Sequence, residues 1–277
     1  MEHREGIFRG MDGLELYYQG WRPNGQARGV LAVVHGVGEH SGRYMNIVNR
    51  LTGRGYVVYG FDQRGHGRSP GQRGHINSWG EYGGDLNAFL NLIGKHEPNL
   101  PLFLLGHSMG ALVALDYLLC QPVALCGAIV SGAPIEPAGV AKPYLVVLAR
   151  FLSRVWPRFS LRLRLDTTAL SRDPAVVKAY ETDPLVHGLA TSRWGTESLA
   201  TIERVKAQAA EVNVPILFIH GGADRLNSPN GSRSFFEKVN GSDKELKVYP
   251  GSYHEPHNDI DYEQVVNDIE QWLERHL

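Results

Sequence analysis

Cysteine is scarce in this chain, and neither positive nor negative charge is in excess. The first feature argues against a disulfide-rich protein and the second against a nucleic-acid-binding protein. The 277 residues include two cysteines, Cys120 and Cys126, whose apolar neighbours predict buried thiols rather than a disulfide or a metal site. The formal net charge is -1, which gives no reason to expect a nucleic acid as a partner. The histidines form no H-E-x-x-H pair that would indicate zinc, so no metal is expected.

Long apolar runs are missing as well. No stretch approaches the roughly 20 residues of a membrane span, and no apolar stretch follows Met1 as it would in a secretory signal peptide. These two absences predict a cytoplasmic protein, with peripheral contact at a membrane surface left open. The length suits one large domain with room for an insertion.

Short apolar runs alternate with helical patterns along most of the chain. Strands are expected over residues 14–21, 30–35, 56–62, 102–107, 124–131, 215–221 and 245–249. Apolar residues at helical spacing predict helices over residues 79–93, 111–119 and 262–273. Continuous apolar runs are typical of strands buried on both faces. The alternation predicts an α/β fold, a mostly parallel sheet with helices on both faces.

Residues 135–203 break this alternation and contain no clear strand. We expect them to form a helical cap over a core made of residues 1–134 and 204–277, although a helical hairpin that only decorates the fold is the alternative. The run 144–156 is too apolar for an exposed decoration. Leu148 and Leu152 in this run are candidates to contact an acyl chain or a lipid surface, and Arg150, Arg154 and Arg158 would suit an anionic interface.

A G-x-S-x-G pattern lies between the predicted strand 102–107 and the predicted helix 111–119. Gly106, Ser108 and Gly110 in this context predict a nucleophile elbow, in which the serine hydroxyl projects above the edge of the sheet. The helix that follows would aim its N–H groups and its positive dipole end at the reacting oxygen. Ser108 is therefore the candidate nucleophile of a serine hydrolase.

A serine nucleophile requires a base and an acid that orients the base, and in this fold the acid precedes the histidine. Asp224 follows the predicted strand 215–221, and His254 follows the last predicted strand, at the sheet edge where such folds place their sites. An aspartate in a simple turn is the alternative for Asp224. His257 is the rival base, and Asp243 and Asp259 are poorer acid candidates because neither ends an apolar strand.

The tetrahedral oxyanion requires two backbone donors. The N–H of Met109 follows the nucleophile directly, and the N–H of Val37 lies in the glycine-containing loop after the strand 30–35. His107 is expected to line or brace the site, and His35 to be a core histidine. Residues 62–69 match neither a P-loop nor a dinucleotide fingerprint and predict a structural turn.

Several of these segments resemble monoacylglycerol lipases. The resemblance covers nearly the whole chain, from Arg9 to Trp272, and is carried by residues 35–44, 62–69, 106–110, 170–174, 180–185 and 222–224. It implies an α/β-hydrolase fold with a cap and hydrolysis of a monoacylglycerol or lysophospholipid ester by Ser108, Asp224 and His254. It also implies that Glu39, Arg43 and Tyr180 hold the glycerol end of the substrate, with surface-structural roles as the alternative. Residues 255–258 depart from the usual pattern.

The expected protein is a serine carboxylester hydrolase with a small lipid ester as its substrate and neither a metal nor an organic cofactor. A lysophospholipase or general carboxylesterase would use the same residues. A peptidase is less favoured because nothing indicates a site for a free amino terminus. A non-catalytic ligand-binding protein of this fold is the alternative from another class, and such a protein would not need a reactive serine.

Overall fold

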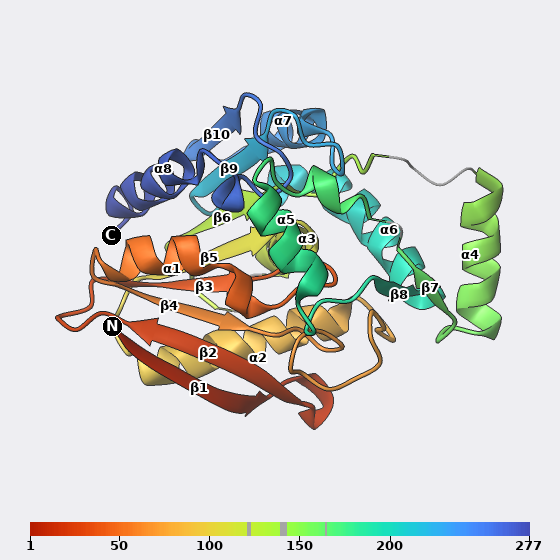
Figure 1. The fold of residues 1–277 in the computed structure, drawn as a ribbon, viewed down its shortest axis with the longest axis horizontal. Helices are drawn as coiled ribbons and strands as arrows, with labels where there is room; N and C mark the ends of the chain where they lie inside the picture. Colours follow the sequence, from red (N-terminus) through yellow and green to blue (C-terminus); the bar gives the residue numbers. More distant parts are fainter. Residues whose placement is uncertain (121–122, 139–142, 164) are drawn as a thin grey trace.

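A single eight-stranded sheet organises the computed structural model, which describes residues 1–120, 123–138, 143–163 and 165–277 (Figure 1). The strand order is β1-β2-β4-β3-β5-β6-β9-β10. The strands are β1 (Glu2–Arg9), β2 (Glu15–Arg22), β3 (Gly29–Val34), β4 (Tyr56–Phe61), β5 (Leu102–His107), β6 (Gly127–Ser131), β9 (Ile216–Gly221) and β10 (Lys244–Tyr249). β2 is antiparallel to β1 and β4, and all pairings from β4 to β10 are parallel.

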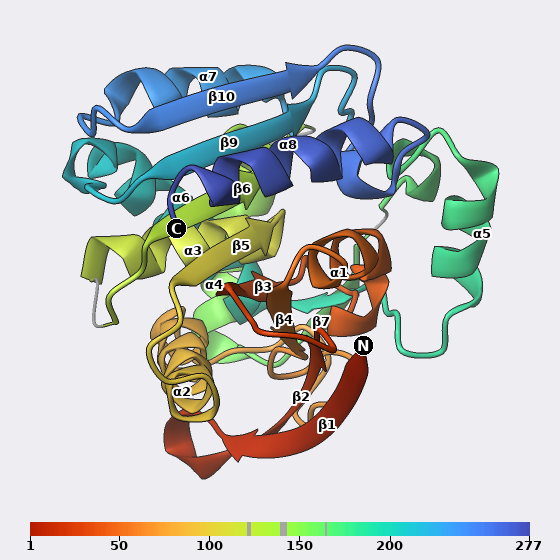
Figure 2. The ribbon, with the colours of Figure 1, turned by 90° about the vertical axis from the view of Figure 1, so that its left-hand side faces the viewer.

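Helices cover both faces of the sheet, as the alternation predicted (Figure 2). α1 (Met45–Thr52) and α8 (Tyr262–Glu274) pack on one face, while α2 (Gly80–His96), α3 (Met109–Cys120) and α7 (Pro229–Lys238) pack on the other. Neighbouring strand residues enter opposite layers because side chains alternate along a strand. Val30, Ala32 and Val34 of β3 join the α2 and α3 layer, and Leu31 and Val33 join the layer of α1 and α8.

The described residues of the insertion between β6 and β9 form α-helices and a small sheet. It contains α4 (Pro143–Val155), β7 (Ser160–Arg162), α5 (Pro174–Thr182), β8 (Leu189–Thr191) and α6 (Ser192–Ala207). The expectation that this segment lacks strands was wrong, because β7 pairs with β8 in an antiparallel ladder. Each strand has three residues, too few to produce a readable pattern. The predicted cap boundary at residue 203 falls inside α6.

Short 3-10 helices complete the chain at η1 (Met11–Gly13), η2 (Ser41–Arg43), η3 (Thr167–Ala169), η4 (Ala209–Glu211) and η5 (Pro256–Asn258). The cysteine prediction was half right. Cys120 and Cys126 are free thiols, but both are exposed because one ends α3 and the other precedes β6. Within the described ranges, no helix combines the length and apolar character required to cross a membrane.

The parallel strands fix where function can reside. Their carboxyl ends meet at one edge of the sheet, and the loops that leave β3, β5, β9 and β10 emerge there together. The chain from the insertion returns over this edge through α5 (Figure 1). The residues predicted to act on a substrate lie on these loops.

Candidate active site

Ser108 occupies a strained turn between β5 and α3. Its φ of 52° lies in the left-handed region that residues other than glycine rarely adopt. The turn is held by hydrogen bonds from Ser108 N–H to Ser131 O (2.8 Å) and from Ala111 N–H to Ser108 O (2.9 Å). A Cβ on Gly106 would lie 2.3 Å from Gly110 O, and a Cβ on Gly110 would lie 2.1 Å from Val34 O. Both glycines are therefore required by backbone packing at the elbow.

Asp224 and His254 meet across the loops that follow β9 and β10. Asp224 Oδ2 lies 2.8 Å from His254 Nδ1, and both side chains are buried. The rival base His257 does not contact Asp224; its ring instead stacks on Tyr44 with centroids 5.0 Å apart. The rival acids are engaged elsewhere, because Asp259 accepts hydrogen bonds from the Tyr253 and Arg172 N–H groups and Asp243 lies beside His276 at the surface.

The electrostatics of this pair suit an ionised carboxylate beside a basic imidazole. Burial opposes the charge on Asp224, but His254, the hydrogen bond from His220 and backbone N–H groups outweigh it and hold the pKa of Asp224 well below its usual range. Burial likewise opposes a proton on His254, yet the charge of Asp224 prevails and raises the pKa of His254. Two backbone N–H groups, from Leu226 and Asn227, donate to Asp224 Oδ1 at 2.8 and 3.0 Å.

A small cavity brings Ser108 and His254 together with residues of the oxyanion loop and of the insertion. Its lining residues are Gly36, Val37, Glu39, His107, Ser108, Leu165, Leu170, Tyr180, Leu226, His254 and Glu255. Leu165, Leu170 and Tyr180 come from the segment between β6 and β9, so the predicted cap contributes part of the wall. Leu148 and Leu152 on α4 are not among these lining residues, and their contact with an acyl chain stays a prediction.

Of the two residues predicted to supply oxyanion donors, Val37 lines this cavity and Met109 does not appear among its lining residues. Gly36 N–H is already taken, because it donates to Glu39 Oε1 at 2.6 Å. Val37 lines the cavity, and no acceptor among the described residues takes its N–H. Met109 is the first residue of α3, where N–H groups lack intrahelical partners. Binding of an oxyanion by the Val37 and Met109 amides stays a prediction.

The ring of His107 packs beside the ring of the candidate base, His254. Its ring lies 4.9 Å from the ring of His254, centroid to centroid, and its Nδ1 lies 3.3 Å from Ser131 Oγ. Burial, reinforced by the neighbouring His254 and His257, lowers the pKa of His107 far below its ordinary value, so the ring is neutral. It lines the cavity without contacting Asp224.

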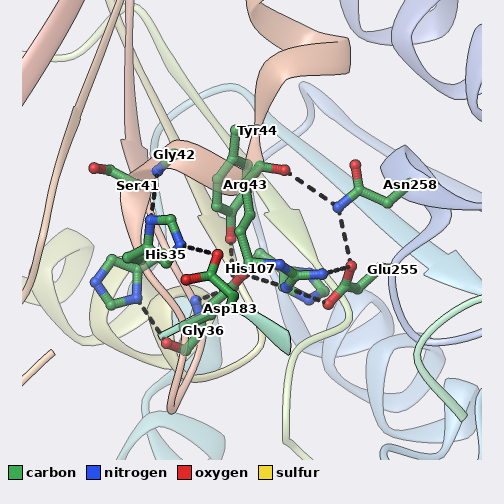
Figure 3. Close-up of polar contacts among 12 residues, drawn as sticks. His35, Gly36, Ser41, Gly42, Arg43, Tyr44, His107, Asp183, Glu255 and Asn258 are labelled. Atoms are coloured by element: carbon green, nitrogen blue, oxygen red, sulfur yellow. Dashed lines mark hydrogen bonds and ion pairs between the residues drawn. The ribbon is translucent and has the colours of Figure 1, made fainter. Parts of the chain in front are cut away.

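The side chain of Arg43 is largely buried between two buried carboxylates, of which Glu255 is labelled in Figure 3. Its guanidinium donates to Glu39 Oε2 at 2.7 Å and to both oxygens of Glu255 at 2.7 and 2.8 Å. Glu39 Oε1 also accepts from Tyr44 OH at 2.8 Å, and Glu255 Oε2 accepts from Asn258 Nδ2 at 2.9 Å. Burial would raise the pKa of Glu255, but the charge of Arg43 outweighs burial and lowers that pKa to about 2.

This network joins the oxyanion loop to the loop of the base, since Glu255 directly follows His254. The family resemblance implied that Glu39 and Arg43 hold the substrate, and Glu255 was not among the predicted site residues. Arg43 is occupied by its two carboxylates, and its cation rests 4.7 Å from the centroid of the Tyr180 ring. Glu39 and Tyr180 do line the cavity. Contact of these three residues with a substrate stays a prediction.

Residues of the insertion hold the site loops in place. His254 N–H and Glu255 N–H donate to Ala169 O and Leu170 O at 3.2 and 2.9 Å. His187 N–H donates to Gly38 O at 2.8 Å, which fastens the insertion to the oxyanion loop. These backbone contacts make the insertion part of the wall that keeps the base and the oxyanion loop in register.

The dense turn after β4 is structural, in agreement with the expectation. Asp62 Oδ1 accepts from Ser41 N–H and Ser41 Oγ at 2.8 and 2.6 Å, and Asp62 Oδ2 accepts from Arg68 N–H at 2.8 Å. Asp62 thus ties this turn to η2, beside Arg43. No group of three or more metal-binding side chains gathers in the described parts of the chain.

Comparisons with known proteins show the family of this chain. A family model described as serine aminopeptidase, S33, matches residues 25–261. A monoacylglycerol lipase from Mycolicibacterium smegmatis is 35% identical over 274 residues, 99% of this chain and 98% of the relative. The crystal structure of Paleococcus ferrophilus monoacylglycerol lipase has a TM-score of 0.88 at 35% identity, covering 95% of this chain and 100% of that one. A soluble variant of monoglyceride lipase from Saccharomyces cerevisiae, in complex with a substrate analog, has a TM-score of 0.87 at 27% identity, covering 97% and 94%.

Removing the buried cation tests the ion network. Arg43→Met should lower the free energy of unfolding by about 3–5 kcal/mol, because Glu39 and Glu255 would stay buried without a counter-charge. The matched control is Arg28→Met, which removes a bidentate but exposed pair with Glu274 and should cost less than about 1 kcal/mol. Urea unfolding measures both. Equal losses of unfolding free energy in the two variants would mean that burial does not increase the cost of removing the cation.

Proposed function

The chain belongs to the serine hydrolase family defined by the S33 aminopeptidase model, with monoacylglycerol lipases as its relatives, and on that premise we propose that it hydrolyses monoacylglycerols to glycerol and a free fatty acid. One observation carries the proposal. Ser108 lies at a strained elbow and shares a cavity with His254, which is hydrogen-bonded to a buried Asp224. A serine, an imidazole and a carboxylate arranged in this order perform acyl transfer in this fold.

The proposed reaction has two halves. His254 takes the proton of Ser108 Oγ as that oxygen attacks the ester carbonyl, and Asp224 stabilises the imidazolium. Val37 and Met109 N–H groups bind the oxyanion, a contribution of about 3 kcal/mol for each donor in comparable sites. His254 then protonates the departing glycerol oxygen, which leaves an acyl-enzyme on Ser108. Water, deprotonated by His254, releases the fatty acid and restores the serine.

Ester hydrolysis is favoured over aminopeptidase activity by the state of the nearby carboxylates. An aminopeptidase requires an acceptor for the free ammonium of its substrate. Glu39 and Glu255 are the acidic residues of the cavity wall, and both are already ion-paired with Arg43 and hydrogen-bonded to Tyr44 or Asn258. In the described part of the cavity wall no carboxylate is therefore free to bind an amine.

A neutral head group suits the cavity better than a phosphate. Arg43 contacts two residues of the cavity wall, and its guanidinium is engaged by their carboxylates. With one positive and two negative charges, the cluster carries a net charge of about -1, which repels a phosphodiester. Glycerol hydroxyls, in contrast, carry no charge and are not repelled by this cluster. This distinction favours monoacylglycerols over lysophospholipids, which the same catalytic residues would otherwise accept.

Residues 135–203 form the proposed cap, and α4 gives it a lipid-facing surface. Ser153 of α4 accepts hydrogen bonds from Arg193 and Thr196 of α6, so the polar side of α4 faces the protein. The opposite side exposes large apolar residues to solvent: Val147, Leu148, Phe151, Val155 and Trp156. Arg150, Arg154 and Arg158 are exposed among them. An apolar face bordered by cations is typical of contact with an anionic lipid surface.

The identity of the base is testable by pH and by substitution. His254→Ala should lower kcat/KM for a monoacylglycerol at least ~10³-fold, while His257→Ala should retain most of it. Only neutral imidazole accepts the proton, and Asp224 raises the pKa of His254, so the ascending limb of kcat/KM should have its midpoint above the ordinary 6.5. Burial lowers the pKa of His257 to about 4, so a limb centred there would identify His257 instead.

The head-group preference is testable with a matched panel. A monoacylglycerol should give a kcat/KM at least about 10-fold higher than a lysophosphatidylcholine with the same acyl chain, which corresponds to about 1.4 kcal/mol. An aminoacyl arylamide should not be turned over. Ser108→Ala, which should lose at least ~10³-fold on the best substrate, controls for contaminating esterases. Faster turnover of the phospholipid or of the arylamide would overturn the assignment.

The lipid-facing surface predicts a chain-length effect. Introducing Leu148→Asp and Leu152→Asp together should reduce kcat/KM on a long-chain monoacylglycerol about 10-fold more than on a soluble short-chain ester, because a buried leucine is worth about 1.5–3 kcal/mol. The control is Ile7→Asp with Ile260→Asp, which alters exposed apolar residues remote from α4. Equal losses on both esters would assign Leu148 and Leu152 a structural role only.

A further inference from the structure

His220 is a polar residue inside an otherwise apolar strand. β9 (Ile216–Gly221) is buried along its whole length. Its other side chains are apolar and belong to the two core layers, whereas the imidazole of His220 is polar and fully buried. Burying an imidazole without hydrogen bonds is costly, so its partners indicate why it is there. Both ring nitrogens have partners, and these lie on the loop of the acid and on α7.

The partners of His220 fix its tautomer. Nε2 lies 3.1 Å from Asn227 O and 3.1 Å from Asp224 Oδ2, so its hydrogen has two acceptors. Carbonyl and carboxylate oxygens only accept hydrogen bonds, so Nε2 carries a proton. Nδ1 lies 2.7 Å from the hydroxyl of the fully buried Ser232. In the neutral ring Nδ1 accepts from this hydroxyl, which leaves the proton on the nitrogen that faces the acid.

Nε2 of His220 therefore contacts the same carboxylate oxygen, Asp224 Oδ2, that is hydrogen-bonded to His254. Asp224 Oδ2 lies 2.8 Å from His254 Nδ1 and 3.1 Å from His220 Nε2, so two imidazoles flank one oxygen. Asn227 connects the loop of the acid to the end of β6, because its Nδ2 donates to Gly132 O at 2.7 Å.

We infer that His220 is a positioning residue for the acid: its Nε2–H holds the Asp224–Asn227 loop and withdraws negative charge from Asp224 Oδ2, with Ser232 setting the tautomer. It does not touch substrate. It acts through Asp224, which in turn orients His254, and the inference rests on the proposed serine hydrolase function. The signal for it in the sequence is a histidine within an apolar run, four residues before the candidate acid.

If His220 withdraws charge from Asp224 Oδ2, its removal should change the pKa of His254, which the loss of a purely packing side chain would not do. Without the Nε2–H, Oδ2 carries more charge and stabilises the His254 imidazolium more strongly, so the pKa of His254 rises further. Glu255 and Glu39 also act on the charge of His254, and the rings of His107 and His257 lie nearby. Among the described hydrogen bonds, none joins these four groups to His220. The shared contact of His220 and His254 is Asp224 Oδ2, so a displaced pH limb would report on that oxygen.

The decisive experiment measures kcat, KM and the pH profile on a monoacylglycerol. His220→Leu should lower kcat about 10- to 100-fold with little change in KM, short of the ~10⁴-fold that follows when an acid no longer fixes the imidazole tautomer. The ascending limb should move upward by about half a pH unit. His220→Gln, whose amide nitrogen reaches the place of Nε2, should restore most of kcat and the original limb. His220→Asn, whose amide is too short, should not.

His75→Leu is the matched control, because His75 is also a buried histidine with a hydroxyl partner, Thr191 Oγ1 at 3.1 Å, but it lies outside the cavity. It should leave kcat and the limb unchanged. The inference would be overturned if His220→Leu lowered kcat without moving the ascending limb of the pH profile. It would also be overturned if His220→Gln lost as much kcat as His220→Asn. If His220→Leu does not fold, the Gln and Asn variants decide alone. An active Ser108→Ala would instead overturn the proposed function itself.

Discussion

The hydrogen bond between His254 Nδ1 and Asp224 Oδ2 is the contact on which the rest of the site depends. It joins two loops that leave neighbouring parallel strands, β9 and β10, at the same edge of the sheet. Burial would neutralise either group alone, but each charge offsets the desolvation of the other. The bond therefore supplies a base of raised pKa in a place where an isolated imidazole would be a poor one. Parallel strands make this possible because they deliver acid, base and nucleophile to one edge.

A second buried set of charges keeps the oxyanion loop at a fixed place relative to the base. Glu39 belongs to the loop after β3, and Glu255 follows the base, so Arg43 between them spans the two halves of the reaction site. Such an arrangement is costly to desolvate and is of little use as a source of stability compared with apolar packing. Its benefit lies in geometry, since a guanidinium that binds Glu255 in bidentate fashion permits little rotation.

Local patterns predicted the parts of this protein that depend on near neighbours in sequence. The buried strands appear as apolar runs, and the elbow is recognisable because Gly106 and Gly110 are both required within five residues of backbone. Asp224 and His254 are predictable because each follows the end of an apolar strand. The exposed strand β1 alternates too weakly to be recognised, and Cys120 and Cys126 are exposed despite apolar neighbours because they lie at the ends of elements. The sequence cannot show pairings such as Arg43 with Glu255, which join residues 212 positions apart.

The central claim is that Ser108 carries the acyl group of a monoacylglycerol during turnover. Acid quenching of the enzyme during turnover of a monoacylglycerol, followed by proteolysis and peptide mass spectrometry, tests this most directly. The account predicts that the peptide containing Ser108 gains one acyl group in place of one hydrogen, and that no other peptide does. Turnover with an acyl group on a different residue would contradict it, as would turnover with no acylated peptide under conditions that trap other serine esterases.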